Sequence, residues 1–271
     1  ILGTFQSTLT NFRYLSREWK KNCDEERLLG VSLTGIMDSP LTNGSKKGLD
    51  KLLEELRTVA YETNKEWADK LGIPVSAAIT CVKPSGTVSQ LVDSASGIHA
   101  RHNPYYIRTV RADNKDPLCK LMKNVGFPNE VDVTKPEHTT VFSFPFKTPK
   151  GAVCRMDMTA LEQLELWKVY AESWCEHKPS VTISVKEDEW VEVAAWVYEH
   201  FDSISGISFL PFSEHTYRQA PYQDCTEEEY KEAVKTMPKN VDWAKLSKYE
   251  SQDYTIASQE MACTAGGCEI I

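Results

Sequence analysis

Short apolar runs rich in β-branched residues alternate along this chain with stripes of apolar residues at helical spacing. The runs are 29–36, 77–82, 139–144, 181–185 and 207–210, and the main stripes fall in 49–60, 164–174 and 190–197. An alternation of strands and helices is typical of α/β proteins, in which helices cover a sheet. The sequence therefore predicts an α/β fold. The tryptophans of the last two stripes are interpreted as packing residues and not as cofactor contacts.

Composition excludes several classes of function. The 271 residues are 41% hydrophobic and 26% charged, which suits one large or two small globular domains. A formal charge of −8 leaves no basic field for a nucleic-acid duplex. No apolar run reaches the length of about 18 residues that a membrane span needs, and no signal peptide is expected after Ile1. We expect a cytoplasmic protein, and the missing initial Met suggests a piece of a longer chain.

The eight cysteines include one close pair, Cys263 and Cys268. No C-x-x-C motif is followed by a second one, so the sequence predicts no metal site. Gly266 and Gly267 permit the turn that a disulfide between the close pair would need. We interpret this pair as redox-active; the alternative is two idle terminal cysteines.

The expected domain organisation follows from composition. No linker rich in Pro, Gly or Ser divides the first 220 residues, and the composition changes after Pro221. We expect a main domain over 1–220, a helical or surface segment over 221–254 and a mobile tail over 255–271.

A candidate phosphate loop follows the apolar run 77–82. Its residues are Pro84, Ser85, Gly86 and Thr87, and a helical pattern begins at Thr87. A strand, a turn with glycine and a helix together point backbone N–H groups and a positive dipole end at an anion. The alternative is a routine N-cap turn, and the residues of the loop alone favour that alternative.

The order of several motifs resembles that of the adenosylcobalamin-dependent, or class II, ribonucleotide reductases. The motifs are Gly30-Val-Ser-Leu-Thr-Gly35, Lys83-Pro-Ser-Gly-Thr-Val-Ser89, Gly97-Ile-His99, Tyr105-Tyr-Ile-Arg108, Phe142-Ser-Phe-Pro145, Pro179-Ser-Val-Thr-Ile183, Gly206-Ile-Ser-Phe-Leu-Pro211 and Ala262-Cys-Thr-Ala-Gly-Gly-Cys-Glu-Ile270. The resemblance covers nearly the whole chain and indicates the C-terminal half of the catalytic chain.

The resemblance implies a fold, a reaction and partners. The fold would be the C-terminal portion of a ten-stranded α/β barrel, followed by a flexible tail. The reaction would be reduction of a ribonucleotide di- or triphosphate to the deoxyribonucleotide used in DNA replication, with adenosylcobalamin as cofactor. Pro84, Ser85, Gly86 and Thr87 would hold the substrate phosphates. Cys263 and Cys268 would pass electrons from thioredoxin, or a similar dithiol, to an active-site disulfide.

One motif of the family is absent. The thiyl-radical cysteine of these enzymes lies in Asn-Pro-Cys-x-Glu, and this chain contains no Asn-Pro-Cys. Cys23 has an acidic residue two positions later, but it lacks the proline and lies in a charged helical run, so we reject it. We therefore expect this chain to need the N-terminal half of the enzyme and to be inactive alone. The alternatives are a non-catalytic, nucleotide-binding half that docks on a separately encoded partner, and a general phosphate-binding α/β enzyme.

Other polar residues stay ambiguous in the sequence. His99, Arg101 and His102 could contact phosphate or cofactor, but a polar surface turn is favoured. Arg108 and Arg111 could bind an anion or pair with carboxylates. Four acidic residues are read as solvated faces or caps: Asp93, Glu162, Glu165 and Glu187.

Overall fold

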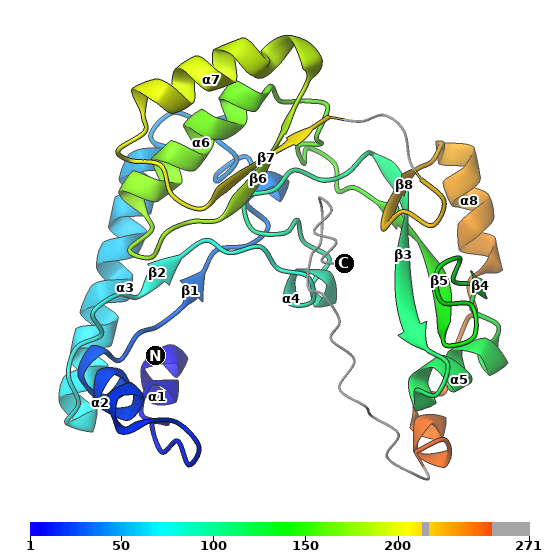
Figure 1. Cartoon of the computed structure of the whole chain (residues 1–271), viewed down its shortest axis with the longest axis horizontal. Helices are drawn as coiled ribbons and strands as arrows, with labels where there is room; N and C mark the ends of the chain where they lie inside the picture. Colours follow the sequence, from blue (N-terminus) through cyan, green and yellow to red (C-terminus); the bar gives the residue numbers. More distant parts are fainter. Residues whose placement is uncertain (213–216, 251–271) are drawn as a thin grey trace. The chain divides into compact units, whose positions relative to one another are not determined.

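The structure is a computed structural model that describes residues 1–212 and 217–250. These residues form two compact units (Figure 1). The first unit comprises 1–101 and 151–212, and the second comprises 102–150 and the described residues from 217 onward. The boundaries expected at residues 220 and 254 are not tested by this division and stay predictions. The tail 255–271, with Cys263 and Cys268, lies outside the described residues.

The first unit contains two pairs of parallel strands. β1 (Val31–Ser32) pairs with β2 (Thr80–Cys81), and β6 (Val181–Val185) pairs with β7 (Ile207–Pro211). Val181, Ile183 and Val185 are buried, whereas the two residues between them are half-buried. Because side chains alternate along a strand, this pattern turns one face of β6 toward the core.

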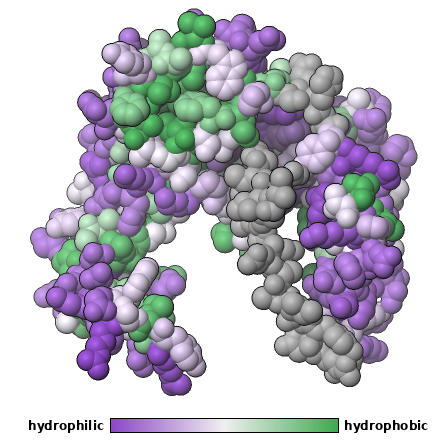
Figure 2. Space-filling model, in the orientation of Figure 1, coloured by the Kyte–Doolittle hydropathy of each residue, from purple (hydrophilic) through white to green (hydrophobic). Residues whose placement is uncertain are grey.

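Helices alternate with these strands along the sequence, and the longer ones, α3, α6 and α7, lie along one side of them (Figure 1). Their bounds are α1 Leu2–Gln6, α2 Arg17–Glu26, η1 Ile36–Asp38, α3 Leu49–Leu71, α4 Val88–Leu91, α6 Ala160–Ser173, η2 Glu187–Glu189 and α7 Trp190–Glu199. Trp167, Trp174 and Trp196 are buried in the core of the unit, which confirms their interpretation as packing residues. Trp190 is the exception, with 37% of its surface exposed. In Figure 2, hydrophobic side chains gather over α6 and α7, where Val191 and Phe201 are exposed.

The second unit is built on an antiparallel sheet with the strand order β4-β5-β3-β8. The strands are β3 Tyr105–Asp113, β4 Asn129–Val131, β5 Thr139–Lys147 and β8 Tyr222–Asp224, and the helices are α5 Pro117–Val125, α8 Glu227–Thr236 and η3 Trp243–Lys248. A small core of Cys119, Met122, Phe127 and Phe142 joins α5 to the sheet.

The α/β class expected from the sequence is confirmed as a mixed α/β fold, whereas the described strands do not show the barrel. The strand expected over 29–36 contains only the two residues of β1. Backbone bonds extend its pairing slightly, from Leu29 N to Ala78 O (3.0 Å) and from Leu33 N to Cys81 O (3.3 Å). Gly35 then turns the chain into η1 with φ +71°, which ends the strand. No helix in the described part of the chain has the length and apolar character needed to cross a membrane.

Candidate functional site

The candidate phosphate loop lies between β2 and α4, in the strand, turn and helix order that the sequence predicts. Pro84 and Thr87 are exposed, and Ser85 and Gly86 are half-buried. α4 has only four residues, so it carries little of the dipole that a long helix would supply. Anion binding here would therefore depend on N–H and hydroxyl groups of the loop.

Ser85 makes hydrogen bonds within the loop. Its Oγ accepts from the backbone N–H of Ser89 at 2.9 Å, and its carbonyl accepts from Ser89 Oγ at 2.6 Å. Its own N–H donates to Ser96 Oγ at 2.8 Å. The Ser85 side chain therefore acts as a helix cap, as the alternative interpretation of the loop expects. Thr87, which occupies the N-cap position, makes no side-chain capping bond. If a ligand binds at this loop, the exposed Thr87 hydroxyl would be better placed than Ser85 to donate to it.

Gly86 does not have the positive φ that its residue type permits; eight other described glycines do. The backbone conformation therefore does not explain the glycine at this position. The backbone of Gly97 packs closely against the start of the loop: a Cβ added to Gly97 would lie 2.7 Å from the carbonyl oxygen of Lys83. The Nζ of Lys83 donates to the carbonyl of Lys178 at 2.7 Å.

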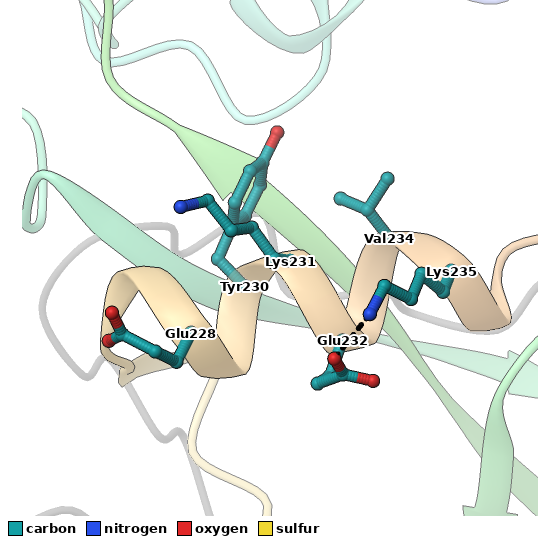
Figure 3. A pocket seen from close by; sticks show the side chains of 6 residues that line it. All are labelled: Glu228, Tyr230, Lys231, Glu232, Val234 and Lys235. Atoms are coloured by element: carbon teal, nitrogen blue, oxygen red, sulfur yellow. Dashed lines mark hydrogen bonds and ion pairs between the residues drawn. The ribbon is translucent and has the colours of Figure 1, made fainter.

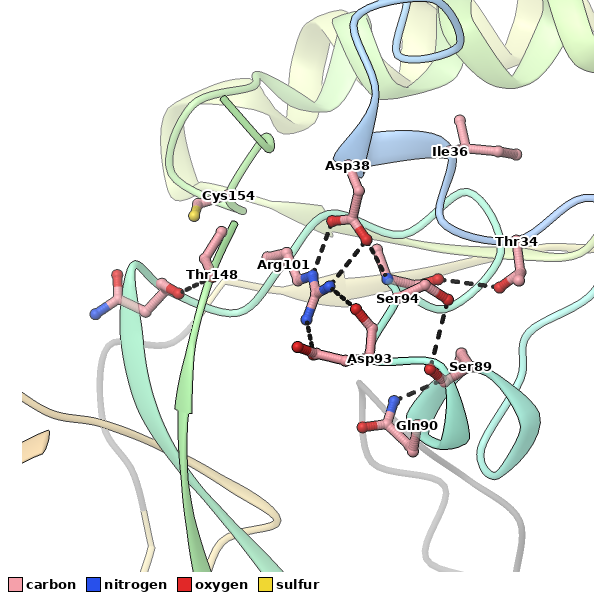
Figure 4. Close-up of polar contacts among 12 residues, drawn as sticks. Thr34, Ile36, Asp38, Ser89, Gln90, Asp93, Ser94, Arg101, Thr148 and Cys154 are labelled. Atoms are coloured by element: carbon pink, nitrogen blue, oxygen red, sulfur yellow. Dashed lines mark hydrogen bonds and ion pairs between the residues drawn. The ribbon is translucent and has the colours of Figure 1, made fainter. Parts of the chain in front are cut away.

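Arg101 lies behind the loop and is buried, with 4% of its side chain exposed. Its guanidinium binds Asp38 through two bonds, Nε to Oδ1 at 2.8 Å and Nη2 to Oδ2 at 2.9 Å (Figure 4). It also binds Asp93 through Nη1 to Oδ1 at 3.1 Å and Nη2 to the carbonyl at 2.6 Å. The expectation of a polar surface turn around Arg101 is wrong, because two carboxylates allow a cation to be buried. Asp93, which was expected to be a solvated or capping residue, binds Arg101 through its carboxylate and its carbonyl.

His99 is also held inside the first unit. Its Nδ1 lies 3.0 Å from the carbonyl of Ser96, and its Nε2 accepts from the backbone N–H of Thr182 at 3.1 Å. Burial lowers the pKa of His99 below its ordinary value. A neutral ring with both nitrogens engaged is a structural element and not a phosphate ligand.

The two arginines of β3, Arg108 and Arg111, have partners as well. Arg111 Nε binds Asp132 Oδ2 at 2.7 Å, and the guanidinium of Arg108 lies 5.7 Å from the ring centre of Tyr222. Burial opposes the ionised form of Asp132, yet bonds from Thr134, the Lys135 backbone and Arg111 outweigh it and hold the pKa of Asp132 well below its usual range. Pairing with a carboxylate is thus the correct alternative for Arg111.

His102 is the remaining member of the predicted polar cluster, and it lies in the second unit. Its Nε2 is 2.7 Å from Asp224 Oδ1, and its ring stacks on Tyr222 with centroids 5.3 Å apart. Its ring is thus held against residues of β8.

Two acidic residues of these networks, Asp38 and Asp132, were not singled out by the sequence. Asp38 ends η1 and Asp132 follows β4. They are separated from their arginines by 63 and 21 positions, respectively. The only signal in the sequence was that Arg111 could pair with a carboxylate, without an indication of which one. Glu162 is a helix cap as expected, because it completes a capping box with Thr159 at the start of α6. Glu165 accepts from Trp196 Nε1 at 2.6 Å.

One depression on the surface of the second unit does not resemble a ligand site. A shallow depression on α8 is lined by six residues of that single helix: Glu228, Tyr230, Lys231, Glu232, Val234 and Lys235 (Figure 3). Polar groups do not converge on it from several elements, as they do in binding pockets. Among the residues that the structure describes, no group of three or more His, Cys, Asp or Glu could hold a metal ion.

Comparison with curated proteins identifies relatives along nearly the whole chain, although no family model matches. The chain is 25% identical to the adenosylcobalamin-dependent ribonucleoside-triphosphate reductase of Lactobacillus gasseri, over 93% of this chain and 37% of that protein. It is 28% identical to the Euglena gracilis enzyme of the same name, over 84% of this chain and 32% of that protein. A probable enzyme of this kind from Dictyostelium discoideum is 30% identical over 90% of this chain and 32% of that protein.

A solved structure has the same fold. It is a crystal structure of a B12-dependent (class II) ribonucleotide reductase, with a TM-score of 0.78 and 23% identity, covering 92% of this chain and 38% of that one. The chain thus spans about a third of the length of the curated relatives that it matches. Over 84–93% of its length, this chain is homologous to the adenosylcobalamin-dependent, class II ribonucleotide reductases.

Proposed function

We propose that this chain is the part of a class II ribonucleotide reductase that binds the substrate phosphates and carries the C-terminal dithiol. The homology along nearly the whole chain is the observation that carries the proposal. The names of the relatives favour a ribonucleoside triphosphate as substrate. Pro84, Ser85, Gly86 and Thr87 would hold its phosphates, with Thr87 as a side-chain donor.

Two half-buried histidines of the first unit are not available as ligands for the cofactor. His99 is engaged as described above, and the Nε2 atom of His177 lies 2.6 Å from the carbonyl of Leu29. In the relatives' chemistry, adenosylcobalamin supplies the radical that starts the reaction. We assign none of the described side chains to adenosylcobalamin and place the radical chemistry in the two thirds of the relatives' length that this chain does not match.

The proposed role of Cys263 and Cys268 is thiol–disulfide exchange. One thiolate attacks the oxidised active-site disulfide, a mixed disulfide forms, and the second tail thiolate releases it as the tail pair becomes oxidised. Thioredoxin, or a similar dithiol, then returns two electrons and two protons to the tail pair. Cys81 and Cys175 are poorer candidates, because burial raises the pKa of Cys81 and raises that of Cys175 to about 12.

The test is a reconstitution. This chain is mixed with a polypeptide that corresponds to the unmatched part of its relatives, and reduction of CTP is followed with adenosylcobalamin and thioredoxin. We expect deoxynucleotide from the mixture and none from either component alone. A mixture that binds nucleotide without reducing it would support the alternative of a non-catalytic half.

A further inference from the structure

We propose that Asp38, Arg101 and Asp93 form a clamp that positions the segment 84–92 for phosphate binding. The proposal rests on the proposed function of the loop and adds residues that do not themselves touch the substrate. We call this set of three residues the Arg101 clamp; Figure 4 shows its members converging on the guanidinium.

The segment needs such a clamp because apolar packing does not hold it. Val88, Leu91 and Val92 expose 62%, 84% and 65% of their surfaces, and only Ser89 of α4 is buried. A helix of one turn is also too short to be stable by itself. Polar contacts must therefore fix where the loop and α4 lie.

The clamp acts at the point where the chain leaves α4. Asp93 adopts φ +47°, a left-handed conformation that is unfavourable for most residues but tolerated by Asp and Asn. Arg101 binds both the carboxylate and the carbonyl of this residue, at 3.1 and 2.6 Å. The guanidinium thus holds the exit of α4 in a conformation that it would otherwise leave readily.

Asp38 connects the clamp to the rigid part of the first unit. Its Oδ2 accepts from the backbone N–H of Ala95 at 2.7 Å, in addition to the two bonds from Arg101. Nearby, Thr34 Oγ1 accepts from Gly97 N at 3.0 Å and donates to the carbonyl of Ala95 at 3.0 Å. Arg101 itself is fixed by backbone bonds from its N–H to Val153 and from Arg155 to its carbonyl.

Electrostatics alone predicts the opposite effect of substitution, and this makes the clamp testable. Two carboxylates and one guanidinium give the clamp a formal charge of −1. The Asp93 side chain is 62% exposed. If its negative charge only repels an anionic ligand, removal of that charge should strengthen anion binding. If Asp93 positions the loop, loss of its side chain should weaken binding instead.

The experiment compares Asp93→Gly with Asp93→Asn in the full 271-residue chain. Glycine keeps the left-handed conformation accessible and the backbone carbonyl in place, but removes the carboxylate that binds Arg101. Asparagine keeps both a side-chain acceptor and the conformation. Calorimetry measures the Kd for CTP and, as a probe without a base, for inorganic tripolyphosphate. If the competent loop conformation falls to about a tenth of its population, Asp93→Gly raises both Kd values about tenfold. Asp93→Asn should bind as tightly as the parent or more tightly.

Matched controls separate positioning from general damage. Asp132→Asn perturbs another buried carboxylate–arginine pair, in the second unit, and should lower the Tm without changing either Kd. Asp38→Asn should behave like Asp93→Gly if the variant folds. If it does not fold, the comparison of Asp93→Gly with Asp93→Asn alone tests the clamp. Unchanged or tighter binding by Asp93→Gly, with binding weakened by Gly86→Val, would overturn the clamp alone. Unchanged binding by both variants would overturn the clamp and the loop's proposed function together.

Discussion

The Nε2 atom of His99 accepts a hydrogen bond from the backbone N–H of Thr182, the second residue of β6, at 3.1 Å. The other ring nitrogen lies 3.0 Å from the carbonyl of Ser96 and therefore carries the proton. A second proton on the ring would face the Thr182 N–H and remove this acceptor. The neutral imidazole thus joins the segment that follows the phosphate loop to β6.

The pH dependence of stability should report this histidine. Because burial lowers the pKa of His99 in the folded state, the unfolded chain binds more protons below the ordinary pKa of about 6.5. Its contribution to stability is therefore complete above that pH and decreases as the pH falls below it. We expect the free energy of unfolding in urea to fall between pH 7.5 and 5.5 by less in His99→Gln, whose amide can still accept from Thr182. Equal losses in parent and variant would contradict this expectation.

Asp132 should stabilise the second unit as an ionised group. Its side chain is 1% exposed and accepts bonds from Arg111, from Thr134 and from the Lys135 backbone. We expect Asp132→Asn to lower the free energy of unfolding at pH 7 by about 1–3 kcal/mol, since charge-assisted bonds are lost. Because the pKa of Asp132 is lowered in the folded state, the difference should shrink as the pH falls below about 3.8, the ordinary value.

Glu130→Gln is the control for this prediction, because Glu130 lies two residues before Asp132, on β4, and is exposed. Chemical denaturation at pH 7 and pH 3 should show little change for it at either pH. A loss as large as that of Asp132→Asn would mean that net charge, and not the Asp132 network, is responsible.

A comparison of two glycines tests close backbone packing before β7. Gly206 and Gly48 both have positive φ, +64° and +86°. A Cβ on Gly206 would lie 2.6 Å from the carbonyl oxygen of Pro179, whereas a Cβ on Gly48 would meet nothing within 4 Å. Gly48→Ala should therefore cost about 1–2 kcal/mol for the left-handed conformation alone. Gly206→Ala should cost clearly more in urea denaturation, and equal costs would show that the backbone at Pro179 relaxes.

Much of the fold could be predicted from local patterns. The run 181–185 coincides with β6, and the apolar stripes of α3, α6 and α7 were identified from their helical spacing. Because these elements bury continuous apolar faces, their apolar residues recur at a regular spacing that can be recognised in the sequence. β1 and β2 are shorter than their apolar runs. The length of a strand depends on its pairing partner and, for β1, on the turn at Gly35, and the local sequence pattern reveals neither of these.

The candidate site was less accessible to sequence reasoning. The position of Ser85, Gly86 and Thr87 between a strand and a helix was foreseen, but the length of α4 and the capping role of Ser85 were not. The pairing of Arg101 with Asp38 joins residues 63 positions apart, and no pattern of spacing encodes such a contact. Burial of Arg101 is a consequence of that pairing, so the surface-turn interpretation could not be corrected without the fold.

The tail cysteines give the last prediction, which concerns the reconstituted enzyme. Cys263→Ser and Cys268→Ser, singly or together, should abolish turnover driven by thioredoxin, because neither variant can complete the two-thiol exchange. A single turnover by enzyme reduced beforehand should survive, since the active-site dithiol is untouched. Cys225→Ser is the control: this thiol is half-buried and burial raises its pKa, so both modes should persist. Deoxynucleotide formation is measured in both modes, and continued thioredoxin-driven turnover by the double variant would show that the tail is not the shuttle.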